Sequence, residues 1–143
     1  MDIILIRIGL LIIGLLGFLH LVYTFADLKS PKKFAPTDKT LLPLMQNTGV
    51  RLVKNPWPGR SFWGSYMGFH FSHSLGILVF VALYLVLSFI TPDILFHPAL
   101  AAILIGTGAI YATLARLYWF SIPFYGATVS TSLTTLGVVL HFV

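Results

Sequence analysis

Long apolar runs alternate with short polar segments along the chain, and this pattern predicts four membrane-spanning helices. The runs cover about residues 3–25, 62–90, 98–119 and 122–143. Each reaches the roughly 20 residues that an α-helix needs to cross the hydrocarbon of a bilayer, whereas barrel strands are about half as long. Lipid leaves free backbone N–H and C=O groups unsatisfied. We therefore expect an all-α fold, a four-helix transmembrane bundle in which residues 1–143 form a single domain.

The composition agrees with a membrane protein. Only 9% of the residues are charged, whereas soluble domains carry about 25%. The chain has no cysteine, which excludes disulfides, thiolate metal sites and iron–sulfur clusters. An integral membrane protein is therefore predicted rather than a soluble globule.

The basic residues predict the orientation of the chain in the membrane. Seven of them lie in the long loop 26–61 between the first two spans: Lys29, Lys32, Lys33, Lys39, Arg51, Lys54 and Arg60. The turn between the second and third spans carries Asp93 and no Lys or Arg. By the positive-inside rule the loop is cytoplasmic and both termini are non-cytoplasmic. Arg7 is expected to snorkel to the opposite surface.

The basic loop has local patterns of its own. Thr37 and Asp38 precede a predicted short helix over 40–46, and the Asn-Pro-Trp-Pro-Gly sequence at 55–59 predicts a turn. We expect an interfacial segment on an anionic membrane surface, and specific recognition of a lipid head group or a partner is the alternative. The charge does not indicate nucleic acid, because orientation already explains basic residues that border spans.

Small residues recur every four positions in the second span, at Gly64, Gly68, Ser72 and Gly76. Small residues let helix backbones approach closely in lipid, so this stripe predicts a helix-packing seam inside the bundle. A seam between copies in a homo-oligomer is the alternative.

Polar side chains from all four spans are predicted to meet in the cytoplasmic half of the bundle. His70 and His73 share a face of the second span with Tyr66, and His20 lies at a similar depth in the first span. Arg116 ends the third span on a face of small residues. The candidate ligand-binding residues are His20, Tyr66, His70, His73, Arg116, Tyr125 and Thr128.

Three interpretations of this group remain open at the level of sequence. The group can be purely structural, with histidines bonded across helices. It can form a site for a lipid or quinone head group in a non-enzymatic accessory or interaction subunit. Such a subunit could act alone, in a larger membrane complex or as a homo-oligomer. It can also bind haem b through His20 with His70 or His73, or zinc through all three histidines, in a small redox protein or enzyme.

The residues that other kinds of catalysis require are missing from the spans. The spans contain no Glu, and no Asp is predicted inside them, which disfavours a di-iron centre or a Ser/His/Asp triad. No catalytic residue is assigned, and binding is favoured over catalysis.

Four stretches carry a resemblance to known proteins: residues 17–25, 34–36, 68–76 and 118–123. Together they resemble a family of small bacterial integral membrane proteins of unknown function, and the resemblance covers most of the chain. The resemblance implies four helices and an inner-membrane location, and it supplies no activity, cofactor or partner. The family's second-span motif is expected to have Asn where this chain has His70, which disfavours a metal role for His70 because Asn is a poor substitute for imidazole.

Overall fold

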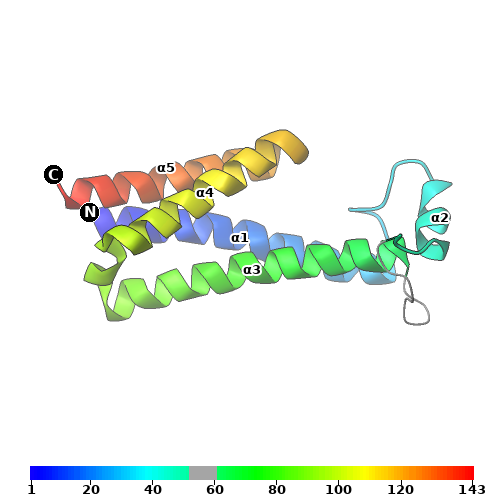
Figure 1. Cartoon of the computed structure of the whole chain (residues 1–143), viewed down its shortest axis with the longest axis horizontal. Helices are drawn as coiled ribbons and strands as arrows, with labels where there is room; N and C mark the ends of the chain where they lie inside the picture. The colour runs from blue at the N-terminus through cyan, green and yellow to red at the C-terminus, as the bar shows by residue number, and fades with distance from the viewer. Residues whose placement is uncertain (52–60) are drawn as a thin grey trace. The chain divides into compact units, whose positions relative to one another are not determined.

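A computed structural model describes residues 1–51 and 61–143, and Figure 1 shows helices joined by loops in this part of the chain. The elements in chain order are α1 (Asp2–Lys29), α2 (Leu41–Asn47), α3 (Phe62–Ile90), the 3-10 helix η1 (Pro92–Phe96), α4 (Pro98–Tyr118) and α5 (Ser121–His141). The all-α class is confirmed. The described ranges hold five α-helices rather than four, because α2 joins the four long ones. The predicted turn at 55–59, like Lys54 and Arg60, lies outside the described residues.

Three of the helices, α1, α3 and α4, are long and apolar enough to cross a membrane, judged by length and composition. The fourth predicted span, α5, is as long as α4 at 21 residues but is not among them. Its polar content is the reason, since Ser and Thr residues lower the mean hydropathy of the helix. Composition alone therefore supports three spans in the described ranges and not the four predicted from sequence.

Local sequence explains where the helices end. Thr91 and Pro92 interrupt the helical run after α3, and the imidazole of His97 then accepts a hydrogen bond from the Ala99 N–H at the start of α4. Before α2, the Asp38 carboxylate accepts hydrogen bonds from the backbone N–H and the hydroxyl of Thr40. These bonds hold the pKa of Asp38 below its ordinary value.

The chain divides into two compact units, and α1 and α3 each contribute to both. The helical unit comprises Met1–Gly17 and Ile77–Val143, and the loop unit comprises Phe18–Gly76.

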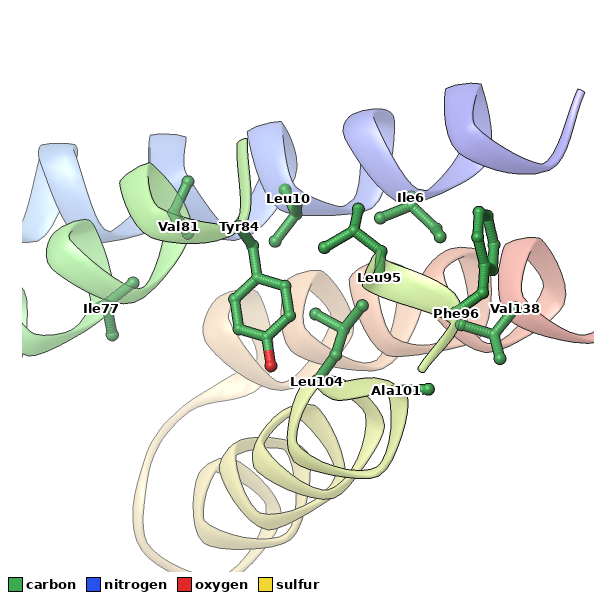
Figure 2. Close-up of a cluster of buried hydrophobic side chains, with 10 residues drawn as sticks. All are labelled: Ile6, Leu10, Ile77, Val81, Tyr84, Leu95, Phe96, Ala101, Leu104 and Val138. Atoms are coloured by element: carbon green, nitrogen blue, oxygen red, sulfur yellow. The ribbon is translucent and has the colours of Figure 1, made fainter. Parts of the chain in front are cut away.

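The helical unit encloses an apolar core drawn from every element in it (Figure 2). Tyr84 is its largest fully buried side chain, and the Tyr84 hydroxyl donates a hydrogen bond to the Leu100 carbonyl oxygen at 2.9 Å. Burial of the tyrosine ring is compatible with its hydroxyl because the hydroxyl has this partner. The core residues are Ile6, Leu10, Ile77, Val81, Tyr84, Leu95, Phe96, Ala101, Leu104 and Val138.

Helices α1 and α5 pack closely and antiparallel in the helical unit. The Ser130 hydroxyl donates to the Gly9 carbonyl oxygen at 2.7 Å, and a Cβ placed on Gly9 would lie 2.8 Å from the Ser130 carbonyl oxygen. A Cβ on Gly137 would lie 2.6 Å from the Asp2 carbonyl oxygen. Glycine is required at both positions because a side chain would collide with the backbone of the other helix.

The predicted seam at Gly64, Gly68, Ser72 and Gly76 does not pack inside the loop unit. All four residues are exposed, and a Cβ on Gly68 or Gly76 would meet no atom within 4 Å. The glycines that permit close helix contact lie instead on α1, α4 and α5 of the helical unit. The homo-oligomer interpretation of the stripe stays a prediction.

Arg7 of α1 bonds to the end of α3, and its snorkelling to a membrane surface stays a prediction. Its Nε donates to the Ser88 hydroxyl at 3.1 Å, and its Nη2 donates to the Ser88 carbonyl oxygen at 2.5 Å. The guanidinium also lies 3.9 Å from the centre of the Phe89 ring. The last carbonyl groups of α3 have no partner within the helix, so they attract a cationic donor from α1.

Candidate functional site

Three histidines lie together in the loop unit, and we call His20, His70 and His73 the histidine cluster. His20 Nε2 and His70 Nδ1 are 2.9 Å apart, which is a hydrogen bond. The ring centres of His20 and His73 are 5.5 Å apart. His70 and His73 face α1 together because residues three apart share a side of a helix.

Hydroxyl residues one turn further along each helix support the cluster. The Thr24 hydroxyl donates to the His20 carbonyl oxygen, and the Ser74 hydroxyl donates to the His70 carbonyl oxygen, each at 2.8 Å. Both Thr24 and Ser74 are fully buried. Each hydroxyl group is hydrogen-bonded within its own helix, so burying it at the contact of α1 with α3 costs little free energy.

Aromatic rings surround the histidine cluster. Phe34 stacks on His70 with 4.3 Å between ring centres, and the same ring lies 4.8 Å from His20. Tyr66 meets His70 edge-on at 4.4 Å, and Phe69 stacks on His73 at 5.9 Å. The half-buried imidazoles are therefore bordered by flat apolar faces on more than one side.

One atom of the cluster lacks a partner. His70 Nε2 is buried and has no hydrogen-bond partner among the described residues. Its other nitrogen is occupied by His20, so Nε2 offers an N–H or a lone pair, depending on the tautomer. Buried polar atoms in proteins are almost always hydrogen-bonded. This nitrogen is therefore an exception among the buried polar atoms of the described residues.

Asp27 organises the loop beside the cluster, and it was not among the predicted site residues. Its carboxylate is buried and accepts hydrogen bonds from the backbone N–H groups of Lys32, Lys33 and Phe34, at 2.7–3.1 Å. These bonds turn the chain back and set the Phe34 ring on His70. One signal was available: an acid in the last turn of a helix is disfavoured by the helix dipole, so it needs donors from elsewhere.

The other predicted site residues, Arg116, Tyr125 and Thr128, belong to the helical unit, where all three are exposed. The Thr128 hydroxyl donates to the Phe124 carbonyl oxygen in its own helix, and the Arg116 guanidinium lies 5.6 Å from the centre of the Phe124 ring. The structure brings His20, Tyr66, His70 and His73 together in one unit. A ligand-binding role for the seven residues stays a prediction.

The geometry of the cluster gives no support to the metal alternatives. In the part of the chain that the structure describes, no group of three or more His, Asp or Glu residues is placed to hold a metal ion. Two axial ligands of a haem must be separated by the iron atom and both of its bonds. His20 and His70 bond directly to each other instead, so as arranged they do not offer two axial positions. The other pair, His20 with His73, stays a prediction.

Comparisons of this chain with protein-family models, with curated proteins and with solved structures found no match. The resemblance to a family of small bacterial membrane proteins therefore stays a prediction. What the chain does has to be inferred from its own side chains.

Proposed function

We propose that this chain is a multi-pass inner-membrane protein that binds the polar head group of a quinone or lipid at the histidine cluster. The observation that carries the proposal is the buried, unpartnered Nε2 of His70. A carbonyl or hydroxyl oxygen of a head group would satisfy this nitrogen. Satisfying a buried polar atom contributes about 1–3 kcal/mol, because that is the cost of leaving it unpaired.

The surroundings of the cluster favour a flat, neutral head group. Phe34 stacks on His70 and Tyr66 meets it edge-on, and aromatic contacts of these two kinds add about 0.5–1.5 kcal/mol beyond the area buried. A neutral imidazole can donate to a carbonyl or accept from a hydroxyl, and the bond between His20 and His70 lets the pair adopt either tautomer. The nearest carboxylate, on Asp27, is already occupied by backbone N–H groups, which favours binding over catalysis.

The same proposal includes α5 as a fourth span, with both termini on the non-cytoplasmic side. Its support is the contact of α5 with the candidate span α1, from Gly126 beside Leu16 to His141 beside Asp2. The hydroxyl groups of Thr128 and Thr131 bond to carbonyl oxygens of α5 itself, which reduces their cost in lipid. The basic loop would then be cytoplasmic.

A titration with a short-chain benzoquinone analogue tests the binding site. The full chain is placed in phosphatidylcholine nanodiscs, and tryptophan fluorescence is followed. Trp63 is a suitable reporter because its ring centre lies 5.6 Å from that of Tyr66, which borders the cluster. We expect saturable quenching, with an affinity that falls about tenfold in His70→Asn because the hydrogen bond at Nε2 is lost.

His97→Asn is the matched control, since it makes the same replacement in the other unit and Asn can still cap α4. Circular dichroism checks that each variant is helical. A lipid ligand is distinguished by mass spectrometry of lipid extracted from the purified chain, where His70→Asn should lose one species that His97→Asn keeps. If both variants bind the analogue like the unmodified chain and retain the same lipids, the proposal is wrong.

A further inference from the structure

The short helix α2 presents apolar side chains that the described chain does not cover. None of its seven residues is buried. The exposed fractions of Leu41 and Leu44 are 44% and 60%. At about 100° per residue these two leucines lie on one side of the helix, and Gln46 lies on the opposite side. A helix this short is unstable in water by itself, so its apolar side calls for a surface to pack against.

Both ends of the segment that carries α2 are fixed to the ends of candidate spans. At one end, Asp27 of α1 holds the backbone of residues 32–34. At the other end, the Phe62 N–H at the start of α3 donates to the Thr48 carbonyl oxygen at 2.6 Å. Figure 1 shows α2 beside the start of α3. The segment is therefore held where α1 and α3 would leave the hydrocarbon of the membrane.

Exposed cations flank α2 in the sequence, and Asp27 and Asp38 in the same segment already have hydrogen-bond partners. The cations are Lys29, Lys32, Lys33, Lys39 and Arg51, and each is exposed. The Asp27 carboxylate is buried among backbone N–H groups, while Thr40 donates to the carboxylate of Asp38. The four lysines precede α2 in the chain, and Arg51 follows it. Cations spread in this way match the diffuse negative charge of a phospholipid leaflet better than a single anion.

We infer that α2 docks on an anionic phospholipid leaflet, with Leu41 and Leu44 entering the interface and the lysines contacting lipid phosphates. Buried apolar area and attraction to anionic lipid together determine how strongly such a helix binds. Leu41 and Leu44 are not part of the histidine cluster, so the docking inference does not depend on the proposed ligand.

Single-cysteine labelling tests the docking, because the natural chain has no cysteine. Leu44→Cys and the matched control Gln46→Cys are each labelled with an environment-sensitive fluorophore. Each full-length variant is placed at one chain per nanodisc, in phosphatidylcholine with or without phosphatidylglycerol. We expect the label at 44 to shift to the blue and to be quenched by lipid-attached nitroxide when phosphatidylglycerol is present, while the label at 46 stays in water.

Lysine substitutions measure the electrostatic part of the docking. Lys32→Gln in the Leu44→Cys background should lower the docked-to-free ratio about fivefold, because each cation near an anionic surface is worth about 1 kcal/mol. High salt should have the same effect. A label at 44 that stays in water with both lipids, or labels at 44 and 46 that are equally protected, would overturn the inference. The second result would point to a protein covering both sides.

Discussion

At the scale of single residues, the site combines side chains that sequence can locate with others that it cannot. The three histidines were identified from helical spacing and from their depth in two neighbouring spans, and in the structure they lie together. Phe34 and Asp27 were not identified as site residues. Their roles depend on a turn of the chain at residues 32–34, and turns held by backbone N–H groups leave no periodic pattern in a sequence.

Asp27→Asn should loosen this turn. An amide offers one neutral oxygen where the carboxylate offers two charged ones, so several N–H groups lose their acceptor. We expect a local loss of about 2 kcal/mol, and hence roughly thirtyfold faster hydrogen exchange at the amides of residues 32–34, measured by mass spectrometry. Asp38→Asn is the control, because its exposed carboxylate bonds only within residues 38–40. Equal exchange in both variants would show that Asp27 does not hold the turn.

At the scale of elements, hydrophobic patterning predicts helices well and their contacts poorly. The predicted span 62–90 coincides with α3, and the other long helices begin and end within a few residues of their predicted limits. The stripe predicted as a packing seam is exposed on α3, and the glycines that contact a neighbouring helix lie on α1, α4 and α5. A small residue at every fourth position shows that close approach is sterically allowed, but it does not identify the partner helix. The relevant glycines of α1 and α5 are spaced irregularly, so no repeat reveals them.

A pair of glycine substitutions distinguishes the predicted stripe on α3 from the glycine contacts between α1 and α5. Gly9→Ala should destabilise the protein by about 1–3 kcal/mol, because the added methyl group would meet the Ser130 carbonyl oxygen and Thr134. Gly68→Ala should be neutral or stabilising by up to about 1 kcal/mol, since nothing lies within 4 Å and alanine favours helices. Unfolding in detergent mixtures measures both. Loss of stability in Gly68→Ala alone would place the working seam on α3, between copies of the chain.

At the scale of the whole molecule, composition and packing indicate different numbers of membrane-crossing helices. Composition supports three, and the contacts of α5 with α1 support a fourth. Composition and helix contacts give different numbers because a hydropathy scale assigns every Ser and Thr the same value, whether or not its hydroxyl group is hydrogen-bonded within the protein. In α5, Ser130 and Thr134 are buried within the helical unit, and both hydroxyl groups have carbonyl partners. A scale built on single residues cannot include such pairing.

Cysteine accessibility decides the number of spans. Asp93→Cys, Arg51→Cys and Val143→Cys are expressed separately, and intact spheroplasts are treated with a membrane-impermeant maleimide. With four spans, positions 93 and 143 react before permeabilisation, and position 51 reacts only after it. Three spans would instead make position 143 behave like position 51. Reaction at 51 alone before permeabilisation would reverse the predicted orientation.

The hydrogen bond between Asp2 and His141 has a mechanical consequence. It joins the first turn of α1 to the last residue of α5, with 3.0 Å between the bonded atoms, and Phe96 stacks on the same imidazole. A force that pulls residues 2 and 141 apart would act on this bond first and then on the contacts behind it, one after another. The antiparallel pair would unzip under a small load, whereas force applied along the helix axes would have to shear all of its contacts at once.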